Sequence, residues 1–122
     1  MLLEEALKSK SIENGINVHR LKEGTILLIV TKNSLYKIIK GPRDVYDITI
    51  QGGKKLPKPV KANFAGSTFG GSLLKIGWIG FLMHMEIHIP SSRRKLTTTG
   101  VRAARIIGDG WEYDMEWKVG ET

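Results

Sequence analysis

Most of the chain after residue 20 alternates between apolar and polar positions, which is the pattern of a β-strand with one buried face. Residues 25–31 form a β-branched apolar run, and the turn-forming sequence Lys32-Asn33-Ser34 separates them from a second strand, which predicts a hairpin. The same reasoning predicts strands at 25–31, 35–40, 45–51, 73–89, 95–107 and 111–118.

Glycines mark where these strands bend or turn. Gly77 and Gly80 interrupt the first half of the segment 73–89, which predicts a strongly bent strand, as at a barrel corner. The alternation slips near Gly100, which predicts a β-bulge. Asp109-Gly110 predicts a tight hairpin turn before the last strand.

Short strands at close spacing predict an all-β domain, either a small barrel or a rolled antiparallel sheet of about six strands, because closure removes exposed strand edges. The apolar positions of these strands supply the predicted core. Its members are Ile26, Ile48, Ile50, Met85, Ile87, Trp111, Tyr113 and Trp117.

The start of the chain has a different period. Apolar residues recur at helical spacing in the first ten positions, which predicts a short amphipathic helix over residues 2–10, packed across an open end or edge of the sheet. The length of 122 residues is that of one domain. We expect the helix and its lead-in at 1–20 and the barrel core at 21–119.

Two features predict a cytoplasmic protein without a membrane span. Glu4 and Glu5 follow directly on the first three residues, where a secretory signal would carry a basic region. The longest apolar stretch, residues 76–83, is shorter than the ~18 residues that a transmembrane helix needs.

The distribution of charge along the chain is more informative about function than its sum. The net charge is +7, but residues 32–105 hold 14 basic and three acidic residues, and an acidic tail follows. A basic block of this kind attracts polyanions such as nucleic acid, anionic lipid or phosphorylated ligands. The chain has no cysteine, which excludes disulfides, cysteine-ligated metal sites and a thiol nucleophile.

Glycine, proline, lysine and serine dominate residues 52–72, which predicts a long loop. Pro57 and Pro59 argue against a helix or a central strand there, and long loops in small domains are usually functional or mobile. Phe64 and Phe69 lie among the basic residues of this segment, where they could stack on bases.

These features favour a binding module for RNA or single-stranded DNA over an enzyme. The predicted contact residues are Lys54, Lys55, Lys58, Lys61, Phe64, Ser67, Thr68, Phe69, Gly70, Gly71, Ser72, Lys75, Arg93, Arg94 and Lys95. Within them, the segment 66–72 could form an anion-binding nest of backbone N–H groups, although a tight turn or bulge also explains its glycines. A small phosphorylated ligand or a protein partner bound by the same loop remains an alternative.

A metal-dependent enzyme is the other alternative. His84 and Glu86 alternate on one strand face and could hold a divalent metal with a residue from elsewhere. His88 cannot join them, because it lies about 13 Å from His84 along a strand. No G-x-S-x-G elbow occurs, so we assign no catalytic residue and no cofactor.

Three segments carry a resemblance to a group of small uncharacterised bacterial proteins. They are Thr31-Lys32-Asn33-Ser34-Leu35-Tyr36, then Gly66-Ser67-Thr68-Phe69-Gly70-Gly71-Ser72, and finally Thr99-Gly100-Val101-Arg102. The group shows T-x-N-S-x-Y, G-S-T/S-x-G-G-S and T-S-P-V-R at these places, so this chain departs from it at Thr99-Gly100. The resemblance spans residues 20–107 and implies one domain, but it implies no activity.

Overall fold

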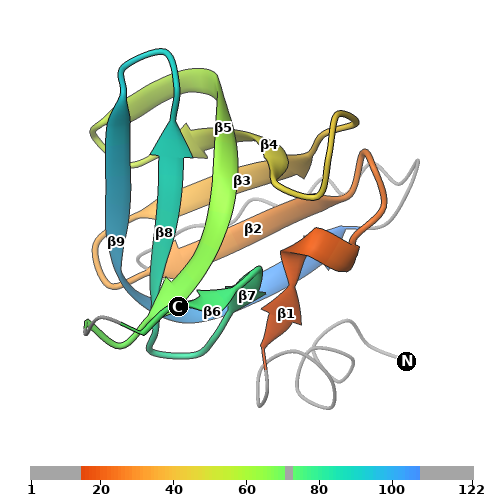
Figure 1. Ribbon diagram of the computed structural model, residues 1–122. Coiled ribbons are helices and arrows are strands. Elements are labelled where there is room, and N and C mark those ends of the chain that lie inside the picture. The colour runs from red at the N-terminus through yellow and green to blue at the C-terminus, as the bar shows by residue number, and fades with distance from the viewer. Residues whose placement is uncertain (1–14, 71–72, 108–122) are drawn as a thin grey trace.

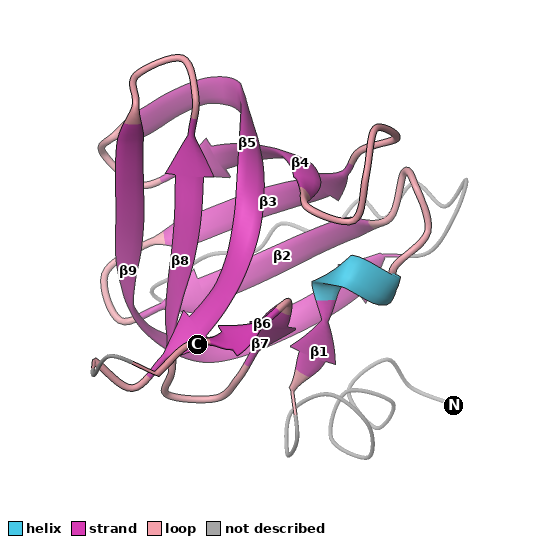
Figure 2. Ribbon diagram, in the orientation of Figure 1, coloured by secondary structure: helices cyan, strands magenta, loops and turns pink. Residues whose placement is uncertain are grey.

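The computed structural model describes residues 15–70 and 73–107, which form an antiparallel β-barrel (Figure 1). Figure 2 shows that strands make up almost all of this part, with one short 3-10 helix. The elements are β1 Ile16–Asn17, the 3-10 helix Val18–Arg20, β2 Ile26–Thr31, β3 Leu35–Lys40, β4 Asp47–Gly52, β5 Leu56–Thr68, β6 Lys75–Ile76, β7 Trp78–Ile79, β8 His84–Ile89 and β9 Arg94–Ile107.

Six strands close into a ring. Each strand of the series β2, β3, β4, β5, β8 and β9 pairs antiparallel with the next, and β9 returns to pair with β2. The predicted all-β barrel of about six strands is therefore confirmed. The predicted helix at 2–10 lies outside the described residues, and no helix within them is long and apolar enough to cross a membrane.

Two long strands form the corners of the barrel. Residues 56–63 of β5 pair with β4 and residues 63–68 pair with β8, while β9 pairs with β8 through 94–100 and with β2 through 101–107. The halves of these strands run in different directions, so β2 to β4 cross β8 at a large angle (Figure 1). Such corners require bulges.

Bulges are found at both corners. The register shifts between Phe64 and Gly66 in β5, and it shifts on both flanks of Gly100 in β9, which confirms the bulge predicted there. Gly66 has φ +155°, and a Cβ at this position would collide with the carbonyl oxygen of Lys75. Glycine at this corner therefore permits β6 to lie close against β5.

The inward-facing residues of the barrel form one core. Ile48, Ile50, Met85 and Ile87 are fully buried, as predicted. Ile26 is only half-buried and is not part of the core: Leu27 and Ile29 are the β2 residues of the core cluster, so the alternation of the strand places Ile26 on its opposite face, and this prediction is wrong. The other three predicted core residues, Trp111, Tyr113 and Trp117, lie outside the described residues, as does the whole predicted strand at 111–118.

The predicted loop at 52–72 is wrong, because most of it is β5. Pro57 and Pro59 are tolerated because residues 56–62 pair with β4 alone, and the register is irregular opposite them. β5 thus completes the ring of six. The predicted single strand at 73–89 is also wrong: it consists of β6, β7 and β8, with a turn at Phe81 and Leu82 before β8.

Candidate functional site

Two hollows lie side by side at one end of the barrel. Hollow A, of about 540 Å³, lies between the start of β5 and the β8–β9 hairpin; hollow B, of about 550 Å³, lies between the β2–β3 and β4–β5 turns and β9. Hollow A is lined by Lys55, Leu56, Val60, Ile89, Ser91, Ser92, Arg94, Lys95 and Leu96. Hollow B is lined by Asn33, Ser34, Tyr36, Lys54, Lys55, Leu96, Thr97, Thr98 and Thr99.

The β4–β5 turn places Lys54 and Lys55 at these hollows. Gly52 pairs with Tyr36 at φ +149°, where a Cβ would collide with the carbonyl oxygen of Leu35. Gly53 follows directly at φ +64°, and a Cβ there would lie 3.2 Å from the side-chain oxygens of Ser34 and Tyr36. The two glycines therefore let the turn lie against β3, so that the lysines after it reach the rim.

The β8–β9 hairpin supplies the other basic residues. Its turn is closed by backbone hydrogen bonds from Ser92 N to Ile89 O at 3.3 Å and from Arg93 N to Pro90 O at 3.2 Å. β9 starts at Arg94 directly after this turn, so Arg94 and Lys95 line hollow A. The Lys95 ammonium also pairs with Glu86 at 3.5 Å across the β8–β9 ladder.

The fold thus joins two basic clusters that are far apart in the sequence. Lys54 and Lys55 lie opposite Arg94 and Lys95 around the hollows, and all four side chains are exposed. Among the described residues, no carboxylate lines either hollow. Glu86 pairs with Lys95 from outside the hollow, and the four cations still leave the rim with a positive net charge that favours an anionic ligand.

The two hollows differ in the chemistry of their walls. Hollow A has an apolar floor made of inward-facing side chains from β5, β8 and β9, namely Leu56, Val60, Ile89 and Leu96. Hollow B has walls rich in hydroxyl and amide groups. Some of these already have partners: Thr98 Oγ1 accepts from Met85 N at 3.0 Å and donates to Thr99 O at 2.8 Å.

The predicted aromatic contacts are not at this site. Phe64 is fully buried in the core, so it cannot stack on a base, and this prediction is wrong. Phe69 is 74% exposed but lines neither hollow. It lies in the β5–β6 connection, where neighbouring apolar side chains such as Leu73 and Ile76 are exposed as well.

The described residues of the predicted anion-binding nest do not form the expected loop. Gly66, Ser67 and Thr68 are buried residues of β5, and Ser67 Oγ donates to the carbonyl oxygen of Trp78 at 2.5 Å. The N–H of Gly70 donates to Thr68 Oγ1 at 3.1 Å, which closes a local turn. The two remaining members of the predicted nest, Gly71 and Ser72, lie outside the described residues.

Four more predicted basic contacts lie outside the hollows. Lys58 and Lys61 are exposed on β5, and Arg93 is exposed at the hairpin turn, but none of them lines a hollow. Lys75 is farther along the chain, in β6, and its ammonium lies 3.9 Å from the centre of the Trp78 ring. These residues contribute to the general positive field of the protein.

The candidate metal residues have protein partners. His84 Nδ1 hydrogen-bonds to Thr98 O at 2.8 Å, and Glu86 pairs with Lys95. Within residues 15–70 and 73–107, no cluster of three histidine, aspartate or glutamate side chains could hold a metal ion. The geometry therefore gives no support to a metal centre in the described part of the chain.

The sequence reasoning missed the polar residues of hollow B. Thr31-Lys32-Asn33-Ser34 forms the β2–β3 turn, and it meets the bulge of β9 through Lys32 N to Gly100 O at 3.0 Å and Asn33 N to Thr99 Oγ1 at 3.3 Å. Two segments far apart in the sequence, residues 31–34 and 99–100, thus come together beside this hollow. The presence of both segments in one sequence was the signal that could have indicated the polar residues of hollow B.

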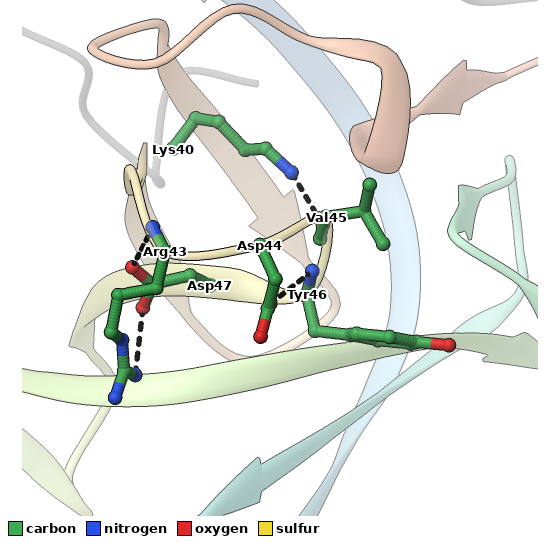
Figure 3. Close-up of polar contacts among 6 residues, drawn as sticks. All are labelled: Lys40, Arg43, Asp44, Val45, Tyr46 and Asp47. Atoms are coloured by element: carbon green, nitrogen blue, oxygen red, sulfur yellow. Dashed lines mark hydrogen bonds and ion pairs between the residues drawn. The ribbon is translucent and has the colours of Figure 1, made fainter.

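A second polar cluster lies in the β3–β4 turn (Figure 3). The buried carboxylate of Asp47 accepts hydrogen bonds from Arg43 N at 3.1 Å and from the Arg43 guanidinium at 2.9 Å, which hold the pKa of Asp47 below its usual range. Lys40 Nζ donates to Val45 O, and burial lowers the pKa of Lys40. These contacts are internal to the turn, so we interpret the cluster as structural.

This cluster predicts an acid-sensitive stability. Because the pKa of Asp47 is lower in the folded than in the unfolded protein, its stabilisation is present above the unfolded value of about 3.9 and is lost as the pH falls below it. Asp47→Asn is expected to cost about 1–3 kcal/mol at neutral pH and to reduce the loss of stability below about pH 4. Urea unfolding at several pH values measures both effects.

The exposed carboxylate of Asp44, in the same turn, provides the control. Its Oδ1 accepts from Tyr46 N at 2.9 Å. Asp44→Asn should leave most of the acid-dependent loss in place. Equal acid profiles for the Asp47→Asn variant and the unmodified protein would contradict the assignment to Asp47.

Comparison of this chain with protein-family models, with curated proteins and with solved structures gives no match.

Proposed function

We propose that this protein binds single-stranded nucleic acid, RNA or DNA, at the basic end of its barrel. The observation that carries the proposal is the joining of Lys54 and Lys55 with Arg94 and Lys95 around two hollows that no described carboxylate lines. Small barrels bind such strands through a basic face that follows the phosphates. The site is thus made of two turns and the ends of β5 and β9, in place of the long loop expected from the sequence.

A small phosphorylated ligand is the second candidate. Each hollow has a volume within the range of about 300–1,000 Å³ that is typical of small-ligand sites. The same lysines would hold its phosphate groups. The two candidates differ in how binding depends on salt, because a strand that crosses the whole rim neutralises several phosphates, whereas a small ligand offers one or two.

Replacing both lysines of the β4–β5 turn tests the proposal. Lys54→Ala with Lys55→Ala is expected to weaken the binding of a labelled mixed-sequence oligonucleotide to a similar extent for all sequences. It should reduce the slope of log K against log salt by about 1.4, since each phosphate contact of a single strand contributes about 0.7. Fluorescence anisotropy over a series of salt concentrations measures both quantities.

A matched pair elsewhere on the chain controls for net charge. Lys22→Ala with Lys75→Ala also removes two positive charges, but from positions that line neither hollow. This variant should keep most of the affinity. Phe69→Ala should leave the affinity unchanged, because Phe69 lies outside both hollows. If oligonucleotides do not bind at low salt, or if both lysine pairs have the same effect, the proposed site is wrong.

A further inference from the structure

We propose that hollow A is a pocket for an unpaired nucleobase, an inference that rests on the proposed function and specifies its ligand. The protein would then select strands whose bases are free to leave the stack. A duplex, or a polyanion without bases, would contact the basic rim but leave the pocket empty. The reasons lie in how the hollow is formed, what covers its floor and what borders it.

Hollow A forms where β5 and the β8–β9 hairpin separate at a corner of the barrel. β5 pairs with β8 only from Asn63 onward, so residues 56–62 have no strand beside them on that side within the described part of the chain. The β8–β9 hairpin diverges from this segment, and hollow A occupies the space between them. Apolar side chains that a neighbouring strand would otherwise cover therefore line the floor of the hollow.

The floor suits the face of a base. Leu56, Ile89 and Leu96 are only 7%, 5% and 8% exposed, so they lie at the bottom of the hollow, and Val60 is half-buried beside them. A planar heteroaromatic ring gains from contact with such aliphatic side chains, as in sites that accept extruded bases. A base within a duplex cannot reach a recessed surface without unpairing.

The rim suits the phosphates on either side of that base. Lys55 borders the hollow from the β4–β5 turn, and Arg94 and Lys95 border it from β9. The cations thus stand on two sides of an apolar floor. A strand that crosses the hollow can place one base on the floor while its flanking phosphates lie against opposite sides of the rim.

The edge of β5 argues against a peptide as the occupant. Phe64 N donates to Tyr46 O, so the alternation along the strand directs the N–H groups of residues 60, 62 and 64 toward β4. Pro57 and Pro59 lie in the segment 56–62, which pairs with β4 alone, and neither has an N–H to donate. Strand addition by a peptide depends on such main-chain donors, so this edge disfavours it.

Filling the hollow tests the inference. Val60→Trp should occupy the space above the floor without removing a charge, and Ile39→Trp introduces the same side chain at a position of β3 that lines neither hollow. The probes are an oligo-dT strand, the same strand with abasic sites, a duplex and linear polyphosphate. Anisotropy, direct or by competition, gives the affinities, and thermal melting confirms that both variants fold.

We expect the unmodified protein and Ile39→Trp to bind oligo-dT roughly 10-fold more tightly than the abasic strand, a difference of about 1.4 kcal/mol. Val60→Trp should lose this preference and keep its affinity for the abasic strand. Equal binding of oligo-dT, abasic strand and polyphosphate would overturn the base pocket but leave the proposed polyanion binding in place. Failure of every probe to bind at low salt would overturn both.

Discussion

Phe64→Ala is expected to reduce the free energy of unfolding by about 3–5 kcal/mol, the range observed when a buried aromatic side chain is truncated to alanine. Phe64 is fully buried at the bend of β5, where this strand changes its partner from β4 to β8. Its removal would leave a cavity in the centre of the core, because the closed ring of strands cannot contract around it. Guanidinium unfolding measures the change.

Two comparisons make this prediction specific. Phe64→Leu preserves most of the apolar volume and should cost less than about 1.5 kcal/mol. Phe69→Ala removes an exposed ring and should stay within about 0.5 kcal/mol of the unmodified protein. If Phe64→Ala kept full stability and lost only oligonucleotide binding, Phe64 would be a contact residue and the description of the core would be wrong.

Gly52→Ala should destabilise the protein by about 2–4 kcal/mol, combining the strain of a positive φ with a steric clash. The new methyl group would meet the carbonyl oxygen of Leu35, and backbone on both sides must move to accommodate it. This movement would also shift Lys54 and Lys55 away from the hollows. We therefore expect weaker oligonucleotide binding even at a temperature where the variant is fully folded, as checked by melting and anisotropy.

Gly24→Ala is the matched control for this variant. Gly24 also has a positive φ, of +87°, but a Cβ there would have no neighbour within 4 Å. It should therefore show the strain alone, about 1–2 kcal/mol, and leave binding unchanged. Equal losses of stability in the two variants would contradict the close approach of the β4–β5 turn to β3.

Local sequence was sufficient for the hairpins and much of the core. The apolar run at 25–31 predicts β2, the turn residues after it predict the hairpin with β3, and the alternation at 45–51 predicts β4. The bulge at Gly100 also follows from local pattern, because an inserted residue disturbs the alternation of the strand itself. The basic character of the middle of the chain is a matter of composition.

Tertiary structure decided the nature of β5. Prolines argue against a central strand, but residues 56–62 of β5 are paired on one side only, and this cannot be known before the partners of the strand are known. The mistaken loop then led to the prediction that Phe64 is exposed. Its burial depends on the pairing of β5 with β8, more than 20 residues farther along the chain.

Ring closure also decided the candidate site. From the sequence, Lys54-Lys55 and Arg94-Lys95 belong to two separate turns, and nothing in either segment indicates the other. The barrel brings them together because β5 and β9 both pair with β8 and then diverge, leaving a hollow with an apolar floor between basic residues. The sequence by itself determined β2 to β4, the turns between them and the charge, since these follow from neighbouring residues. Which charges share a surface followed only from contacts between distant residues.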